Sequence, residues 1–382
     1  MNCKKCHSPM TVTLRKQDYY CDDCFMANTN HKFRACIGKN KVLVPNENVL
    51  ICLSGGLGST VLLDLVHYGL TLNNNKKLRI VPYFLHLFDC LPIGKDVAES
   101  LIKQCQKYNF NLYIFHLSSY MNTNSQSLEA NCIPDVEENE LKEFNDILMS
   151  MPPSAVNDYL LKIKRNLFIK IAKQLTCSTV FTAETTITLA TNLLSNLAIG
   201  RGSQVQNDIG FSDFRDKNVK ILRPMKDISQ EELTYYTKIK HLSPVCKNNM
   251  KSNSLQSAIS SFVTDLQENF QSTISTVCKT ADKIGELGEA DILNQCIICK
   301  VTVYYSLYIL GTQIYERLQI SSFIFHLRTI IPRSDVLWKH VRIALSQKIN
   351  YEKVCVIHSY QWPHRINVQV KNINCSGKNK SV

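Results

Sequence analysis

The middle of the chain alternates short apolar runs with stretches whose apolar residues recur at helical spacing. The uninterrupted runs predict strands at residues 49–53, 79–87, 111–117, 178–182 and 218–222. Residues 60–70 and 158–175 each carry one apolar face and predict helices. Strands that are apolar throughout and alternate with helices are typical of a sheet covered on both faces. We therefore expect an α/β fold with a doubly wound, mostly parallel sheet.

A further apolar stripe predicts one continuous helix over residues 254–277. The side chains on this stripe are Leu255, Ile259, Phe262, Val263, Leu266, Phe270, Ile274 and Val277. A stripe of this kind contacts either the core of the domain or a partner protein, and it carries no catalytic group.

Composition divides the chain into three parts. Residues 1–30 form a compact cysteine-rich head, residues 31–290 an α/β domain, and residues 291–382 a basic tail with both tryptophans. The net charge is +12, but residues 300–382 hold 12 Lys and Arg against 3 Asp and Glu. Most of the positive excess therefore lies outside the α/β domain, which weakens an interpretation of that domain as a basic nucleic-acid-binding module. The sequence leaves open whether the tail is ordered.

No membrane-spanning segment or secretory leader is visible in the sequence. The N-terminus lacks an apolar stretch, and every apolar run is shorter than the ~18 residues that a membrane span requires. We expect a cytoplasmic protein without a membrane partner. In that compartment, sixteen cysteines favour metal sites and buried thiols over disulfides.

A glycine-rich turn follows the first predicted strand and precedes its helix. Within it, Gly55, Gly56 and Gly58 would let backbone N–H groups approach a phosphate, and Ser54 and Ser59 add hydroxyl donors. No Gly-Lys-Ser/Thr follows, so the turn is not a Walker A loop. The alternative is a tight turn that needs glycines for steric reasons alone. The strand–loop–helix context favours a nucleotide site, present or ancestral, with ATP as the candidate ligand.

Two Cys-x2-Cys pairs stand in the head. Cys3 and Cys6 precede Cys21 and Cys24 by 14 residues. Four thiolates at this spacing suit a tetrahedral Zn²⁺ ion, which would stabilise a head too small for a core of its own. The alternative is four unbound buried thiols. The sequence therefore predicts a structural zinc site with these four ligands.

The glycine-rich turn resembles the SGGxDS signature of PP-loop ATPases, with Gly58 in place of the aspartate. Further segments resemble the cytoplasmic tRNA 2-thiolation protein 2 family. They are HKFR at residues 31–34, FTAE at 181–184, GRG at 200–202, RPMKD at 223–227 and, most specifically, the stretch 260–283. The resemblance covers about residues 1–299 and implies a PP-loop ATPase-like domain with a small N-terminal zinc-ribbon-like head.

This resemblance implies a subunit of the cytoplasmic tRNA 2-thiolation complex. The subunit would be the non-catalytic partner in a heterodimer with a catalytic PP-loop paralogue. The complex would move sulfur from a thiocarboxylated ubiquitin-like carrier onto wobble uridine 34 of the Lys, Glu and Gln tRNAs. Loss of the motif carboxylate at Gly58 implies weakened binding of ATP and its metal.

The resemblance also suggests Arg34, Arg201 and Arg223 as contacts to a phosphate or the RNA backbone. The alternative for Arg201 is a structural role in a helix C-cap and the loop after it. The alternative for Arg223 is that it stands at the end of a strand, before a proline. Family members carry a second Cys-x2-Cys pair after the one formed here by Cys296 and Cys299. Either this second metal site is incomplete, or the tail differs through splicing or the gene model.

Two other functions remain open from the sequence. The first is an autonomous ATP-dependent adenylating sulfurtransferase or amidotransferase, which the glycines favour and Gly58 opposes. The absence of a Cys-x2-Cys pair between the loop and residue 248 also opposes it. The second is a zinc-ribbon RNA-binding module with an incidental α/β domain, which predicts RNA affinity that falls steeply with salt.

Overall fold

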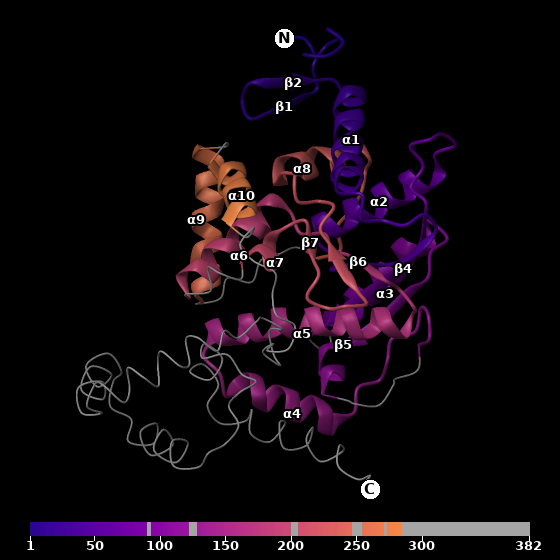
Figure 1. Cartoon of the computed structure of the whole chain (residues 1–382), viewed down its shortest axis with the longest axis vertical. Helices are drawn as coiled ribbons and strands as arrows, with labels where there is room; N and C mark the ends of the chain where they lie inside the picture. The colour runs from indigo at the N-terminus through magenta and orange to yellow at the C-terminus, as the bar shows by residue number, and fades with distance from the viewer. Residues whose placement is uncertain (90–92, 122–127, 200–204, 247–253, 271–272, 285–382) are drawn as a thin grey trace, which may run out of the picture. The chain divides into compact units, whose positions relative to one another are not determined.

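The computed structural model describes residues 1–89, 93–121, 128–199, 205–246, 254–270 and 273–284 (Figure 1). All of them belong to one compact unit, Met1–Leu287. Three sequence predictions lie outside the described residues: the contact by Arg201, the pair formed by Cys296 and Cys299, and the basic tail.

A six-stranded sheet forms the centre of this unit. In spatial order its strands are β5 (Leu112–His116), β4 (Ile80–Phe88), β3 (Glu47–Cys52), β6 (Thr179–Phe181), β8 (Lys220–Leu222) and β7 (Ser212–Asp213). Every neighbouring pair is parallel except β7 with β8. The predicted α/β fold is confirmed, and the five predicted strands begin and end within two residues of β3, β4, β5, β6 and β8. The short antiparallel edge strand β7 was not predicted.

Helices follow most strands. They are α1 (Asp22–Asn40), α2 (Leu57–Thr71), α3 (Ile93–Gln106), α4 (Glu138–Met149), α5 (Pro153–Gln174), α6 (Thr186–Ala198), α7 (Val205–Ile209), α8 (Gln230–Ile239), α9 (Leu255–Asn269) and α10 (Thr273–Ile284), with a 3-10 turn η1 (Leu117–Tyr120). The head contributes a hairpin of β1 (Val12–Leu14) and β2 (Asp18–Tyr20). Within the described part of the chain, no helix is both long enough and apolar enough to cross a membrane.

Both faces of the sheet are covered, which explains the uninterrupted apolar runs. Along β3, Val49 and Ile51 pack into the core that also holds Val61 of α2. The alternate residues Leu50 and Cys52 are buried on the opposite face, where α5 contacts β3 and β6. Burial on both sides fixes the position of β3, and with it the loop that leaves its carboxyl end.

A buried carboxylate links α2 to α8. Asp64 of α2 accepts hydrogen bonds from the hydroxyls of Tyr108, at 3.0 Å, and of Tyr236 on α8, at 2.7 Å. Burial, followed by the charge of Asp64, raises the pKa of Tyr236 far above its ordinary range. Two phenol donors compensate a carboxylate that is withdrawn from water.

A network of ion pairs braces α5, α7 and β7. The buried Arg215 guanidinium contacts Asp208 at 2.6 Å and Asp213 at 2.7 Å. Arg165 pairs with Asp213 at 2.6 Å, and Lys162 with Asp208 at 3.1 Å. Burial by itself would raise the pKa values of both carboxyls, but these cations outweigh it and hold both pKa values far below the ordinary range.

The prediction of one helix over residues 254–277 is wrong, because α9 ends at Asn269 and α10 begins at Thr273. The Phe270 backbone leaves the helical conformation with φ −134°, and its N–H donates to the carbonyl of Leu266. The predicted stripe therefore divides. Val263 and Ile274 are buried beside Ala190 of α6, whereas Phe270 is exposed.

Candidate functional site

The glycine-rich loop lies at the carboxyl edge of the parallel sheet, between β3 and α2. Leu53 still belongs to the ladder, since its N–H donates to Leu85 of β4 at 2.8 Å. Its carbonyl lies 2.8 Å from Nδ1 of the buried His86, also on β4. Ligands of open α/β sheets bind beyond this edge. Ser54, Gly55, Gly56, Gly58 and Ser59 therefore lie where the sequence predicts a phosphate site.

Gly55 adopts a left-handed conformation, with φ +80°, and this backbone favours glycine. Its carbonyl accepts hydrogen bonds from the N–H groups of Val245 and Cys246, both at 2.9 Å. A Cβ atom at this position would lie 3.2 Å from Cys246 Sγ and from Val97 Cγ1. The segment after α8 therefore packs directly on the loop.

Hydroxyl groups order the rest of the loop. Ser59 is buried, and its hydroxyl donates to the carbonyl of Gly56 at 3.0 Å. Thr60 donates to the same carbonyl at 3.1 Å, a role that sequence reasoning did not assign. Ser54 is exposed, with its Oγ 3.4 Å from Ser59 Oγ. The first N–H groups of a helix have no intrahelical acceptor, so the start of α2 presents donors and positive partial charge beside Ser54.

Gly58 is closed in by the segment after β6. A Cβ atom at this position would lie 2.9 Å from the carbonyl oxygen of Ala183 and 3.5 Å from Thr185 Cγ2. The first distance is shorter than the van der Waals contact of carbon with oxygen. Any larger residue at position 58, an aspartate included, requires the backbone at Ala183 to move. Gly58 is therefore a packing requirement of this loop.

Arg223 has a structural position beside the loop. Its Nε donates to Glu184 at 2.6 Å, and its two terminal nitrogens donate to the carbonyls of Gly210, at 2.9 Å, and Asn207, at 3.2 Å. The side chain is buried. Arg34 is half-buried on α1 and does not join this cluster. Of the three candidate arginines, the structure describes Arg34 and Arg223, and these two do not lie together. No local sequence signal indicated the pairing of Arg223 with Glu184.

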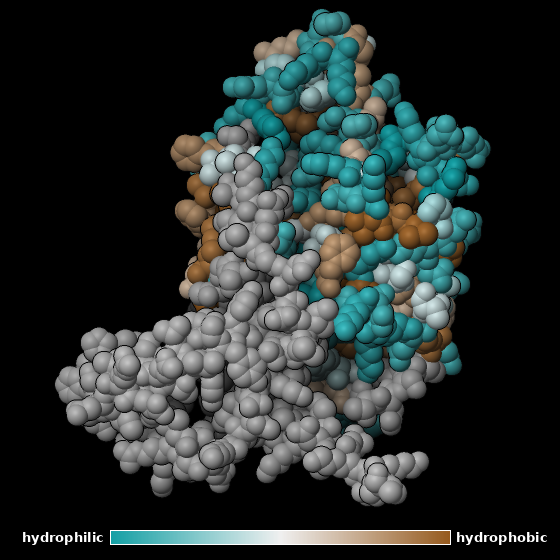
Figure 2. All heavy atoms as spheres, in the orientation of Figure 1, coloured by the Kyte–Doolittle hydropathy of each residue, from teal (hydrophilic) through white to brown (hydrophobic). Residues whose placement is uncertain are grey.

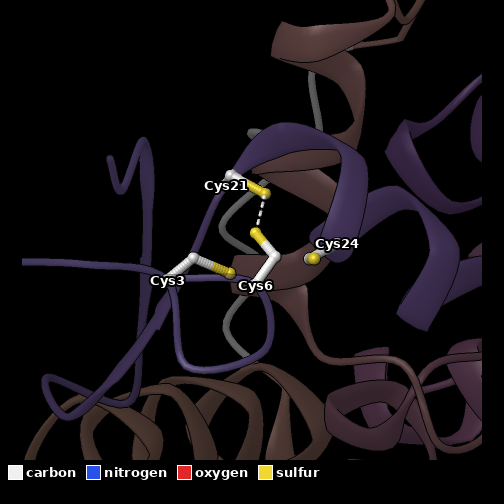
Figure 3. Close-up of side chains that lie close together, drawn as sticks. All are labelled: Cys3, Cys6, Cys21 and Cys24. Carbon is white, nitrogen blue, oxygen red and sulfur yellow. Dashed lines mark hydrogen bonds between the residues drawn. The ribbon is translucent and has the colours of Figure 1, made fainter. Parts of the chain in front are cut away.

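The four head cysteines form one cluster (Figure 3). Their sulfur atoms all lie within 4.8 Å of one another, and those of Cys6 and Cys21 are 3.4 Å apart. A tetrahedral site with metal–sulfur bonds of about 2.3 Å places its sulfurs about 3.8 Å apart. Cys3, Cys6, Cys21 and Cys24 could therefore hold a metal ion with little adjustment. Within the described residues, no other group of three or more His, Cys, Asp or Glu side chains meets this spacing.

Local backbone structure brings the four sulfurs together. Cys3 N–H donates to Ser8 at 2.7 Å, and Lys5 N–H points at Cys3 Sγ at 3.5 Å. Cys21 precedes the first residue of α1, and Cys24 lies in its first turn. Burial acts to raise the pKa of Cys3, but the N–H groups around its sulfur outweigh it and lower that pKa to about 6, whereas hydrogen bonding with Cys21 raises the pKa of Cys24 to about 12. Donors aimed at sulfur favour the thiolate, which is the form that binds metals.

The head is fixed to α8. Phe25, next to Cys24, lies edge-on to Tyr235 with ring centres 6.2 Å apart. Lys32 of α1 pairs with Glu232 at 2.6 Å, and Glu232 also completes a capping box with Ser229. The hairpin is tied down too, by the N–H of Arg15, which donates to a carboxylate of α8. Head and domain therefore share one packed interface.

The remaining described cysteines are separate. Cys52, Cys105 and Cys177 are buried, and burial raises the pKa of each thiol. Cys132 is exposed. Cys246 is half-buried against Gly55, and burial, followed by the charge of Asp89, raises its pKa. The four thiols whose pKa values are raised, those of Cys52, Cys105, Cys177 and Cys246, are therefore weak nucleophiles at neutral pH.

Comparison with solved structures gives the same fold. The U34-tRNA thiolase NcsA from Methanococcus maripaludis, solved with its 4Fe-4S cluster, superimposes with a TM-score of 0.59. The match covers 80% of this chain and 96% of that chain at 18% sequence identity. At this identity the likeness establishes the PP-loop fold alone.

Sequence comparison gives the family. A family model described as cytoplasmic tRNA 2-thiolation protein 2 matches residues 254–314. The protein of that name from Drosophila yakuba is 34% identical over 319 residues, covering 78% of this chain and 76% of the relative. The one from Drosophila ananassae is 35% identical over 298 residues, covering 74% and 73%. The chain therefore belongs to the cytoplasmic tRNA 2-thiolation protein 2 family.

Proposed function

We propose that this chain is the non-catalytic subunit of a cytoplasmic complex that thiolates wobble uridine 34 of the Lys, Glu and Gln tRNAs. Its partner in the heterodimer is a catalytic PP-loop paralogue. The sulfur comes from a thiocarboxylated ubiquitin-like carrier. Membership of the tRNA 2-thiolation family supports the role in thiolation, and the state of the glycine-rich loop supports the division of labour.

The contact between Gly58 and Ala183 carries the non-catalytic assignment. Adenylation releases pyrophosphate, and acidic ligands hold the metal ion that accompanies those phosphates. Position 58 has no carboxylate, and the Ala183 carbonyl occupies the space that its Cβ would need. The loop retains the donors of an anion cradle without the metal-binding group, so it binds ATP weakly and does not turn it over.

The cysteines support the same assignment. The resemblance implies that the catalytic paralogue handles sulfur with a cluster of cysteines in its nucleotide domain. In this chain the described thiols of that domain are separate, and burial raises the pKa values of Cys52, Cys105 and Cys177. Sulfur transfer therefore takes place on the partner.

The four-cysteine cluster of the head holds a structural zinc ion. Cys3, Cys6, Cys21 and Cys24 are its ligands. Four thiolates leave no open coordination position, so the ion stabilises the head and does not bind substrate. Two neighbouring residues of α8, Glu231 and Glu232, bind the hairpin and α1, and these contacts keep the head in a fixed position beside the PP-loop domain.

Reconstitution tests the proposed function. The paralogue is purified with and without this chain, and 2-thiouridine is measured on the three tRNAs. Thiolation that needs both chains, with pyrophosphate released only when the paralogue is present, is the expected result. Pyrophosphate release by this chain alone would instead support the autonomous adenylating enzyme. Full thiolation without this chain, or failure of the two to copurify, would end the proposal.

A further inference from the structure

The tip of the β1–β2 hairpin has an unusual sequence for its conformation. Arg15 and Lys16 both have positive φ angles, 52° and 58°, and the N–H of Gln17 donates to the carbonyl of Leu14 at 3.2 Å. Two successive left-handed residues at the centre of the four-residue turn from Leu14 to Gln17 are the pattern for which Asn-Gly is preferred. Non-glycine residues are strained there. Strain of this kind clusters at functional sites, which motivates a search for a function of these two side chains.

The side chains at this tip are exposed cations. Neither Arg15 nor Lys16 has a side-chain acceptor in the described part of the molecule, and both are open to solvent. Lys4 lies at the base of the hairpin, where its N–H donates to the Tyr19 carbonyl at 2.8 Å and its ammonium group pairs with Asp18 at 2.6 Å. Residues 1–30 contain four Lys and Arg against three Asp, and neither Asp22 nor Asp23 lies at the tip. On the face drawn in Figure 2, hydrophilic residues predominate over this part of the head.

The tip is hydrogen-bonded to the domain. The N–H of Arg15 donates to Glu231 of α8 at 3.1 Å, which fixes the turn against the domain. The other end of the hairpin is fixed by Lys4 and by the cysteine cluster. Tyr19 and Tyr20 follow directly and are half-buried, so part of each ring stays accessible. Preorganised cations beside aromatic rings suit a nucleic acid, which offers both phosphates and stacking surfaces.

We propose that the Arg15–Lys16 tip contacts the phosphodiester backbone of tRNA. This inference rests on the proposed function, since it assigns the surface through which this subunit binds the RNA. Guanidinium and ammonium groups bind phosphate oxygens without regard to sequence, which suits a subunit that serves three different tRNAs. The competing explanation is that these cations balance the negative charge of four thiolates around a divalent metal. The experiment distinguishes this explanation from RNA binding.

The experiment uses the copurified heterodimer and measures tRNA affinity at several salt concentrations. Arg15→Glu with Lys16→Glu is compared with Lys76→Glu with Lys77→Glu, an equally exposed pair in the loop between α2 and β4. The hairpin variant is expected to weaken binding by about tenfold or more, and to reduce the slope of log affinity against log salt by roughly two. The control pair is expected to change neither.

A third variant separates function from folding. Arg15→Asn with Lys16→Gly places the preferred residues in the turn, so it should raise the urea midpoint while it weakens tRNA binding. A gain in stability with unchanged affinity would overturn the proposal and leave the proposed function intact. So would zinc loss from the Glu variant, which would assign the cations to the metal centre, or loss of the paralogue from it, which would assign the tip to a protein contact. A wild-type heterodimer that binds no tRNA would defeat both proposals.

Discussion

A Cβ atom on Gly58 would lie 2.9 Å from the carbonyl oxygen of Ala183. Gly58 lies in the first turn of α2, which follows β3, and Ala183 lies just after β6, so the contact joins two neighbouring strand ends of the sheet. The loss of the PP-loop carboxylate is therefore coupled to packing between these two segments. Restoring an aspartate at position 58 would supply the charge but would meet a steric obstacle at Ala183.

Gly58→Ala tests this contact without adding charge. We expect it to lower the free energy of unfolding by about 1–3 kcal/mol, because the added methyl group must displace backbone. Urea unfolding measures the change. Gly38→Ala is the matched control: a Cβ at exposed Gly38 on α1 has no neighbour within 4 Å. That substitution should be neutral or stabilise by up to about 1 kcal/mol.

Gly58→Asp should lower the free energy of unfolding at least as much as Gly58→Ala does. It should not give the chain the ability to release pyrophosphate from ATP. The carboxylate alone does not restore catalysis, since the segment that includes Ala183 has to retreat first. A pyrophosphate assay on the purified variant with ATP and Mg²⁺ provides the measurement. Release well above the wild-type background would contradict the non-catalytic assignment.

Loss of one cluster cysteine should release the metal and loosen the head. Cys6→Ser removes an exposed ligand, and we expect bound zinc to fall from about one ion per chain to near zero. Metal analysis gives the stoichiometry, and amide exchange over residues 1–40 reports the loosening. Cys132→Ser removes an equally exposed thiol that lies outside the cluster, and it should change neither. Equal zinc content in the two variants would rule out the four-thiolate site.

The buried ion network predicts a stability loss in acid. The pKa values of Asp208 and Asp213 lie below the ~3.9 of an unfolded aspartate, so their contribution is fully present above about pH 4 and declines as the pH falls further. Asp213→Asn should lower the free energy of unfolding by about 3–5 kcal/mol near neutral pH, because it removes the carboxylate that pairs with both Arg165 and Arg215. The cost should shrink below pH 4. Urea midpoints measured between pH 3 and 7 test this.

Asp146→Asn, at an exposed position on α4, serves as the control for that series. It should leave the midpoint nearly unchanged at every pH, since surface carboxylates contribute little. A cost for Asp213→Asn that stays constant down to pH 3 would mean that the network does not carry the acid sensitivity.

Arg223 and Arg34 should separate stability from RNA binding. Arg223→Ala removes the donors to Glu184, Gly210 and Asn207, so we expect a loss of about 3–5 kcal/mol in unfolding free energy. Arg34→Ala should leave the stability within about 0.5 kcal/mol. Of the two, only Arg34→Ala should reduce the tRNA affinity of well-folded heterodimer. Stable Arg223→Ala protein with weakened tRNA binding would restore Arg223 as an RNA contact.

The features predicted correctly from sequence were local ones. Continuous apolar runs located β3, β4 and β5 because burial on both faces leaves that pattern. The spacing of Cys3, Cys6, Cys21 and Cys24 indicated a cluster because each pair lies within one turn. The position of the glycine-rich loop followed from the strand before it and the helix after it.

The features that were missed depend on contacts between distant segments. The pairing of Arg223 with Glu184 joins the ends of β8 and β6, and the approach of Ala183 to Gly58 joins the ends of β6 and β3. Neither leaves a periodic trace in the sequence. The break after Asn269 was missed because the apolar stripe continues through it, and only the packing of α9 and α10 against α6 shows where the chain turns.

The two hydrogen bonds that Gly55 accepts from Val245 and Cys246 have a consequence for biosynthesis. The ribosome makes the glycine-rich loop early, but its two backbone donors emerge about 190 residues later. A nascent chain that has reached only α8 can already pair its strands, yet the loop still lacks these partners. The glycine-rich loop is thus among the last parts of this unit to acquire all its contacts during translation.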